Sequence, residues 1–106
     1  MTEMTVDDLK AKLDKKDKFI LLDVRESHEL EIASIKGASP VHIPLGQLPQ
    51  RFAELDKSQE VAVLCRSGGR SAQATHYLRL QGYNADNVAG GILAWSARID
   101  PSIPQY

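Results

Sequence analysis

Short runs of apolar residues, each followed by a helical pattern, constrain the fold of this chain more than any other feature. Residues 19–24 (FILLDV) are almost continuously apolar, and residues 61–64 (VAVL) form a second such run. Runs of this kind are typical of parallel strands that are covered on both faces. After the second run, the spacing of Ala72, Ala74 and Leu78 predicts a helix. The chain therefore has the alternation of strand and helix that produces a parallel sheet.

Other parts of the chain fit this alternation. Thr5, followed three residues later by Asp8, forms a variant of the capping box, which predicts a first helix of about ten residues. The remaining predicted elements are short strands at residues 41–43 and 84–88, a helix over residues 45–55 that Pro49 interrupts early, and a last short helix after Gly90 and Gly91. Pro101 and Pro104 end the regular structure, and we expect the tail to be mobile.

Length and composition fit one globular domain over residues 1–106 and exclude several classes of protein. A chain of 106 residues buries about two-thirds of the surface that it exposes when unfolded, so a second core does not fit. The formal net charge of -1 gives no basis for binding nucleic acid or a membrane. No apolar run approaches the roughly 20 residues of a spanning helix, and the first residues, MTEMT, are unlike a leader sequence. We therefore expect a cytoplasmic protein.

The only cysteine, Cys65, lies between the apolar run at 61–64 and the predicted helix. In an open parallel sheet, ligands collect at the carboxyl ends of the strands. The first N–H groups of a helix have no partners inside the helix and carry partial positive charge, so anions bind there. A single cysteine also excludes an internal disulfide and implies no oxidising compartment. This position predicts a thiol that faces groups able to hold a negative charge.

The loop after Cys65 is suited to hold an anion. Gly68 and Gly69 let the chain curl without Cβ clashes, so the backbone N–H groups of residues 66–70 can point inward at one atom. The arginines at both ends of this stretch add positive charge. Such surroundings lower the pKa of a thiol, and the thiolate is a nucleophile at neutral pH. The alternative is that Cys65 is an inert, buried small side chain.

Asp23 ends the first apolar run and lies at the same predicted edge of the sheet as Cys65. Its carboxylate has three interpretations: it orients a loop through backbone amides, pairs with an arginine, or caps the helix that begins near Glu26. The sequence leaves the three open.

Three stretches resemble signatures of the rhodanese family of sulfurtransferases. Cys65-Arg-Ser-Gly-Gly-Arg-Ser71 is similar to the active-site loop of that family. Leu22-Asp-Val-Arg-Glu-Ser-His-Glu29 is similar to its first signature, and Ala89-Gly-Gly-Ile-Leu-Ala-Trp95 resembles its closing one. The resemblance covers nearly the whole chain, from about Thr5 to Trp95.

A fourth stretch resembles the family with one departure. The second signature of rhodaneses reads Gly-His-Ile-x-Gly-Ala followed by Ile-Pro, and this chain has Ala33-Ser-Ile-Lys-Gly-Ala38 followed by Ile43-Pro44. Ser34 therefore stands where the family has a histidine. If that histidine has only a structural role, activity survives its absence.

The resemblance implies an α/β fold, a rhodanese-like open sheet of about five mostly parallel strands with helices on both faces. It also implies an enzyme that moves a sulfane sulfur from a small anionic donor such as thiosulfate to cyanide or a thiol, through a persulfide on Cys65. Cys65 is then the catalytic residue, and the donor is bound by Arg66, Ser67, Gly68, Gly69, Arg70 and Ser71. No cofactor is expected, and the three histidines lack the spacing of metal ligands: His28, His42 and His76.

Two other functional classes compete with this interpretation. Cysteine phosphatases and arsenate reductases use a Cys-x5-Arg loop, but only four residues separate Cys65 from Arg70, which favours a ring for one sulfur over a ring for phosphate. A non-catalytic binding module is the other class. A related possibility is a sulfur carrier that passes its persulfide to a partner protein, which requires the same thiol.

Overall fold

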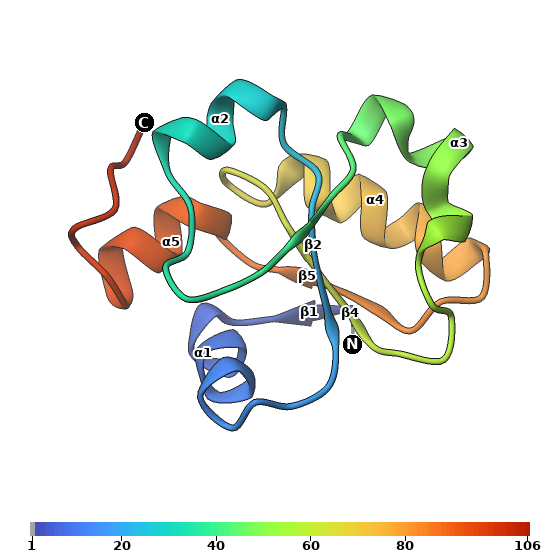
Figure 1. Cartoon of the computed structure of the whole chain (residues 1–106), viewed down its shortest axis with the longest axis horizontal. Helices are drawn as coiled ribbons and strands as arrows, with labels where there is room; N and C mark the ends of the chain where they lie inside the picture. Colours follow the sequence, from blue (N-terminus) through green and yellow to red (C-terminus); the bar gives the residue numbers. More distant parts are fainter. Residues whose placement is uncertain (1) are drawn as a thin grey trace.

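A sheet organises the structure, a computed structural model that describes residues 2–106 (Figure 1). The five strands of this sheet are all parallel and lie in the order β1-β5-β4-β2-β3. They are β1 (Glu3–Met4), β2 (Ile20–Asp23), β3 (Val41–His42), β4 (Val61–Leu64) and β5 (Ala85–Val88). The predicted parallel α/β sheet is thus confirmed. Only β1 was not predicted, because two residues carry no periodic pattern.

β4 lies at the centre of the sheet, between β2 and β5. Its register pairs Val61 with Ile20 and Leu64 with Asp23. All four residues of β4 are buried, and successive side chains point to opposite faces. Because β2 and β4 end level with each other, Asp23 and the residue that follows Leu64 emerge at the same edge of the sheet.

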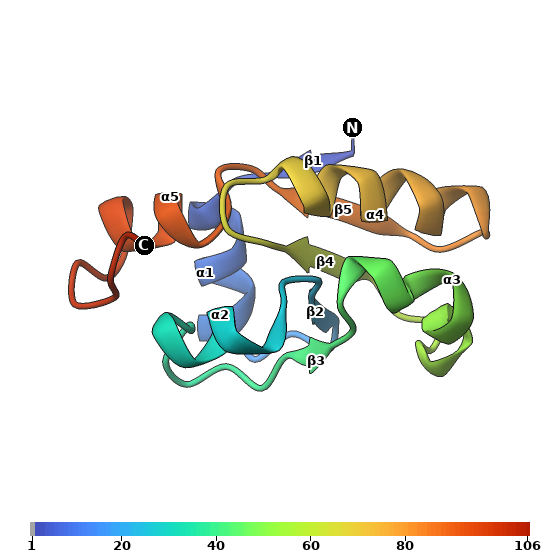
Figure 2. The same cartoon turned by 90° about the horizontal axis from the view of Figure 1, so that it is seen from above.

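Helices cover both faces of the sheet, as predicted (Figure 2). They are α1 (Val6–Asp14), α2 (Ser27–Ile32), α3 (Leu48–Arg51), α4 (Gly69–Leu80) and α5 (Gly91–Arg98). Leu9 of α1 and Trp95 of α5 belong to the core on one face. Leu48 of α3 and Leu78 of α4 belong to the core on the other face. Among the described residues, no helix is long and apolar enough to span a bilayer.

The segment over residues 45–55 differs from the single helix that its apolar spacing predicted. It forms a 3₁₀ turn (Leu45–Gln47), then the four-residue α3, then a second 3₁₀ turn (Phe52–Glu54). Pro49 has no N–H to donate and is tolerated only in the first turn of an α-helix. The α-helix therefore begins at Leu48 and not at Leu45.

The C-terminal tail packs against the domain, so the expectation of a mobile tail was wrong. Ile103 is 3% exposed and belongs to the same core cluster as Trp95. The ring of Tyr106 lies 5.9 Å from the guanidinium of Arg25 and 5.1 Å from that of Arg66. Apolar burial and cation–π contacts thus hold the tail over the carboxyl end of the sheet.

Candidate active site

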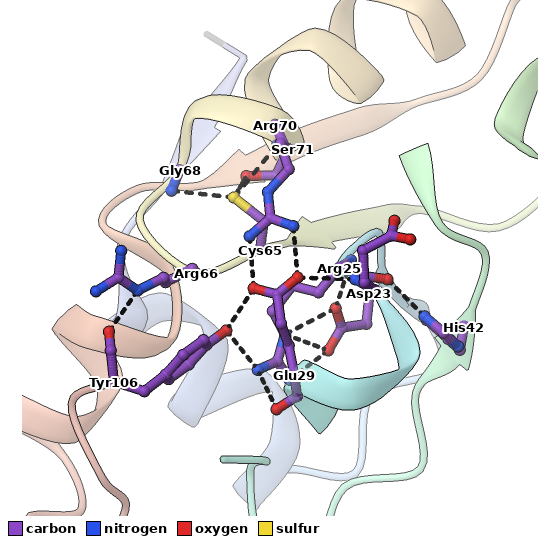
Figure 3. Close-up of polar contacts among 11 residues, drawn as sticks. Asp23, Arg25, Glu29, His42, Cys65, Arg66, Gly68, Arg70, Ser71 and Tyr106 are labelled. Carbon is purple, nitrogen blue, oxygen red and sulfur yellow. Dashed lines mark hydrogen bonds and ion pairs between the residues drawn. The ribbon is translucent and has the colours of Figure 1, made fainter. Parts of the chain in front are cut away.

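Cys65 follows β4 directly, and three hydrogen-bonding groups surround its sulfur (Figure 3). The backbone N–H of Gly68 donates to Sγ at 3.1 Å, and the backbone N–H of Ser71 donates at 3.4 Å. The Ser71 hydroxyl oxygen lies 3.2 Å from Sγ. The loop thus curls around the sulfur as the glycines indicated, and it brings together Cys65, Gly68 and Ser71.

The conformation of Gly68 makes this curl possible. Its φ of 107° lies in the left-handed region, which residues with a Cβ rarely adopt. A Cβ at this position would also approach the backbone nitrogen of Gly90 to 3.3 Å. Gly68 is the N-cap of α4, so the first turn of this helix faces the sulfur. The predicted combination of a glycine turn and a helix N-terminus is therefore present around Cys65.

The surroundings of Cys65 favour the thiolate although the residue is only 1% exposed. Burial raises the pKa of the thiol, because a charged sulfur loses its hydration. The Ser71 hydroxyl, in the orientation that donates to the sulfur, and the backbone N–H groups of Ser71, Gly68 and Ser67 act in the opposite direction and prevail, so the pKa lies below its ordinary value. Cys65 is buried, as the alternative of an inert small side chain requires, and belongs to the same core cluster as Leu78, but its sulfur also has these polar partners.

The N-terminus of α5 fixes the other side of the loop. The backbone N–H of Ile92 donates to the carbonyl of Cys65 at 3.0 Å, and the backbone N–H of Leu93 donates to the carbonyl of Arg66 at 3.0 Å. Gly91 is the residue that permits this approach. A Cβ on Gly91 would lie 2.4 Å from the Cys65 carbonyl oxygen. The Gly-Gly pair of the closing signature thus contributes to the site as well as to a tight turn.

Arg70, one of the two predicted donor-binding arginines, is paired with Glu29 of α2. Its two terminal nitrogens donate to the two carboxylate oxygens at 2.6 and 2.7 Å. The hydrogen bonds to Glu29, and to a smaller degree the charges of Glu29 and Cys65, raise the pKa of Arg70. Glu29 also accepts hydrogen bonds from the backbone N–H of Glu26 and from the Tyr106 hydroxyl. Arg70 is therefore held beside the loop by a bidentate ion pair.

This ion pair predicts a specific loss of stability in acid. The hydrogen bonds from Arg70 lower the pKa of Glu29 to about 2 from an ordinary value of 4.5. A depressed carboxyl pKa stabilises the folded state fully above the unfolded-state value, and this contribution disappears as the pH falls through the folded-state value. We expect the unfolding free energies of wild type and Glu29→Gln to differ at pH 7 and to converge between pH 4.5 and pH 2.

Urea titrations across that range check this result. Glu31→Gln, at an exposed position of the same helix, is the matched control and should follow wild type at every pH. A constant gap between wild type and Glu29→Gln down to pH 2 would contradict the prediction.

Arg66, the other predicted donor-binding arginine, contacts the tail. Its Nε donates to the backbone oxygen of Tyr106, and its guanidinium lies over the ring of the same residue. Both arginines thus lie beside the loop, and each has a partner within the chain. Tyr106 was not anticipated as part of the site, because its contacts depend on the return of the tail, which no local pattern in the sequence indicates.

Asp23 is paired with an arginine, which is one of its three interpretations. Its carboxylate accepts from the Arg25 side chain at 2.8 to 3.1 Å and from the Arg25 backbone N–H at 3.0 Å. Both side chains are almost completely buried. The capping interpretation is wrong, because the capping box of α2 is formed by Glu26 and Glu29.

Two further predictions concern the histidines. Nε2 of His42 lies 2.6 Å from the backbone oxygen of Arg25, which ties β3 to the backbone of the ion-paired arginine. Ser34, at the position of the histidine in the family, donates from its hydroxyl to the carbonyl of Leu30 on α2 at 2.6 Å and not to the sulfur of Cys65. In the part of the chain that the structure describes, no three His, Cys, Asp or Glu side chains are grouped to hold a metal ion.

Asn87 of β5 is a component of the site that the sequence analysis missed. The Ser71 hydroxyl donates to its Oδ1 at 2.5 Å, and its Nδ2 donates to the carbonyl of Gly68 and to the carboxylate of Glu3, both at 3.3 Å. Asn87 is 4% exposed. A polar residue in the predicted strand at 84–88 was a signal that could have identified it, because a buried amide requires partners.

Comparisons with known proteins agree with this geometry. The model of the rhodanese-like domain family matches residues 5–98. YtwF of Bacillus subtilis is 38% identical over 99 residues, which cover 93% of this chain and 94% of YtwF. A protein of Allochromatium vinosum named as a sulfurtransferase is 35% identical over 97 residues, or 91% of this chain and 89% of its own. The crystal structure of a rhodanese-like domain protein from Staphylococcus aureus has a TM-score of 0.81 at 31% identity, with 100% of this chain and 99% of that chain covered.

Proposed function

Because the chain belongs to the rhodanese-like domain family, whose relatives include sulfurtransferases, we propose that it transfers a sulfane sulfur through a persulfide on Cys65. The observation that carries the proposal is the position of Sγ, which accepts hydrogen bonds from two backbone N–H groups of a loop that begins a helix. Such a loop favours a thiolate, and the thiolate is the nucleophile that attacks sulfur.

The first half-reaction loads the sulfur. The Cys65 thiolate attacks the outer sulfur of thiosulfate, the S–S bond of the donor breaks, and sulfite leaves with the bonding electron pair. Arg66 and Arg70 attract and orient the anionic donor. Because Cys65 is 1% exposed, the side chains that cover it must move apart for the donor to reach Sγ. The product is a persulfide whose outer sulfur carries the negative charge.

The second half-reaction removes the sulfur. The carbon of cyanide, or the thiolate of an acceptor, attacks the outer sulfur of the persulfide and takes it, and the electron pair of the broken S–S bond returns to Cys65 as thiolate. Backbone N–H groups of Ser67, Gly68 and Ser71 stabilise the charge on sulfur in both steps, as the donors of an oxyanion hole stabilise oxygen. No cofactor enters either step. We further propose a cytoplasmic location, since a lone cysteine does not require an oxidising compartment.

Mass spectrometry of the intact protein after incubation with thiosulfate tests this proposal. Wild type is expected to gain the mass of one sulfur atom. Added cyanide should remove this sulfur and be converted to thiocyanate. Cys65→Ser is expected to gain nothing. An equal gain in Cys65→Ser, or none in wild type, would overturn the proposal. Turnover of an aryl phosphate that disappears in Cys65→Ser would point instead to a phosphatase.

The acceptor is tested separately. Persulfidated protein is mixed with a small thiol, with cyanide, or with a protein that presents an acceptor thiol, and the loss of sulfur from Cys65 is followed. Fast transfer to small acceptors supports an enzyme. Transfer to the protein acceptor alone supports a sulfur carrier, and retention of the sulfur with every acceptor contradicts both.

A further inference from the structure

Ser71 contacts both the sulfur and Asn87, and it has one hydroxyl proton to donate. Its Oγ lies 3.2 Å from Cys65 Sγ and 2.5 Å from Asn87 Oδ1. A hydroxyl donates one hydrogen bond and accepts others. When the proton points to Asn87, Oγ can only accept from Sγ, and this favours the protonated thiol. When the proton points to Sγ, it favours the thiolate and leaves Oδ1 of Asn87 without this donor.

The surroundings of Asn87 decide between these two arrangements. The Nδ2 of Asn87 faces two acceptors, the carbonyl of Gly68 and the carboxylate of Glu3. A flipped amide would direct Oδ1 at those two oxygens, which is unfavourable. Oδ1 therefore faces Ser71 and accepts its proton. Because Asn87 is 4% exposed, water does not readily replace that donor when Ser71 turns away.

We propose that Asn87 is a positioning residue that directs the Ser71 hydroxyl proton away from Cys65, so that loss of the thiol proton requires the hydroxyl to turn. The thiol proton leaves to water, the hydroxyl then rotates to donate to the sulfur, and the Asn87 carbonyl loses a hydrogen bond. Asn87 thus restrains the formation of the nucleophile. The inference deepens the proposed function and rests on Cys65 acting as the nucleophile in it.

The charged side chains near the sulfur affect both orientations of the Ser71 hydroxyl equally. Arg70 of α4 attracts the thiolate and is paired with Glu29 of α2, while Arg66 of the loop binds Tyr106. Asp23 and Arg25 pair with each other after β2. Glu3 of β1 contacts Asn87 and not the sulfur. None of these contacts involves the Ser71 hydroxyl, so its direction depends on Asn87.

Alkylation of Cys65 by iodoacetamide as a function of pH tests the inference, because the rate follows the thiolate and requires no sulfur donor. Asn87→Leu replaces the amide by an apolar side chain of similar size and so removes the acceptor. The Gly68 carbonyl keeps its bond from the N–H of Ala72 in this variant. One net hydrogen bond predicts alkylation about two- to tenfold faster than wild type below the midpoint of the profile. Loss of structure in the loop would expose Cys65, which is 1% exposed, and would raise the rate at every pH, whereas the inference predicts a lower midpoint of the pH profile, so the midpoint is the deciding readout.

Ser71→Ala completes a double-mutant cycle. Added to Asn87→Leu, Ser71→Ala is expected to cancel the increase in alkylation rate. Added to wild type, Ser71→Ala should change the alkylation rate much less. Gln73→Leu, which makes the same amide-to-leucine change at an exposed position of α4, is the control and should match wild type. Equal effects of Ser71→Ala in both backgrounds, or slower alkylation in a folded Asn87→Leu, overturn the inference.

A second variant covers the case in which Asn87→Leu does not fold. Asn87→Asp keeps an acceptor toward Ser71 and adds negative charge, so its alkylation is expected to be equal to or slower than that of wild type. Faster alkylation in Asn87→Asp overturns the inference. Normal alkylation behaviour together with no sulfur loading from thiosulfate would count against the proposed function alone, so the two failures are distinguishable.

Discussion

Gly91→Ala is expected to destabilise the protein by about 3 kcal/mol or more and to reduce sulfur transfer at least ~100-fold. The added Cβ would lie 2.4 Å from the carbonyl oxygen of Cys65 and 2.6 Å from that of Arg66. Both are backbone atoms, so no side chain can rotate to make room. The φ of 57° at Gly91 adds strain for alanine. The α5 N-terminus must therefore separate from the loop, and the loop loses the bonds that hold its shape.

Urea unfolding and the thiosulfate assay measure these two effects. Gly46→Ala is the matched control, because a Cβ at Gly46 meets no atom within 4 Å and its φ is not in the left-handed region. This control should leave sulfur transfer unchanged and change stability little. A Gly91→Ala variant with wild-type stability and activity would show that α5 does not hold the loop as described.

Arg25→Met is expected to lower the free energy of unfolding by about 3 to 5 kcal/mol. Arg25 is 0% exposed, and its side chain provides two of the nitrogens that bind the Asp23 carboxylate. Without it, Asp23 is left as a buried charge that keeps only the N–H of residue 25 as a described donor. The change also removes the hydrogen bond to the Tyr106 hydroxyl, which loosens the tail.

A second substitution separates the cost of the unpaired charge from the loss of packing. Asp23→Asn combined with Arg25→Met should recover part of the stability, since the amide carries no charge. Arg51→Met, which breaks the exposed pair with Glu54, is the matched control and should cost far less stability than Arg25→Met. If Arg25→Met costs no more than Arg51→Met, the buried pair does not have the role assigned to it.

The main features of the fold could be predicted because they are local. The capping box of Thr5 and Asp8 is present at the start of α1, with both of its hydrogen bonds. The apolar runs at 19–24 and 61–64 contain β2 and β4 at the middle of the sheet. These patterns report a local propensity together with burial on both faces, which neighbouring residues are sufficient to reveal.

The loop that surrounds the sulfur could be predicted for the same reason. The residues that reach the site from other elements could not. Cys65, Gly68 and Ser71 lie within seven residues, so the turn that brings them together is encoded locally. Asn87 and Tyr106 reach the site through contacts that are distant in sequence. The position of Asn87 depends on the pairing of β5 with β4, and that of Tyr106 on the packing of the tail. Single-sequence patterns carry no information on such pairings.

The arginines show a further limit of sequence reasoning. A cation close to a cysteine in sequence suggests free positive charge, but Arg70 is paired with a carboxylate 41 residues away. Whether a charge is available to a ligand depends on its partners in the fold. The sequence showed the residue types of the site, and the structure shows which of their charges are already paired.

Apart from the Ser71 hydroxyl and the Asn87 amide, the described groups that hydrogen-bond to the sulfur or hold the loop around it belong to the main chain. Peptide groups of the loop hold Sγ, and peptide groups of α5 hold that loop. The exposed side chains of Arg66 and Ser67 have no part in either set of bonds. Substitutions of these two side chains can therefore change the surface around Cys65 while Sγ keeps the same main-chain hydrogen bonds.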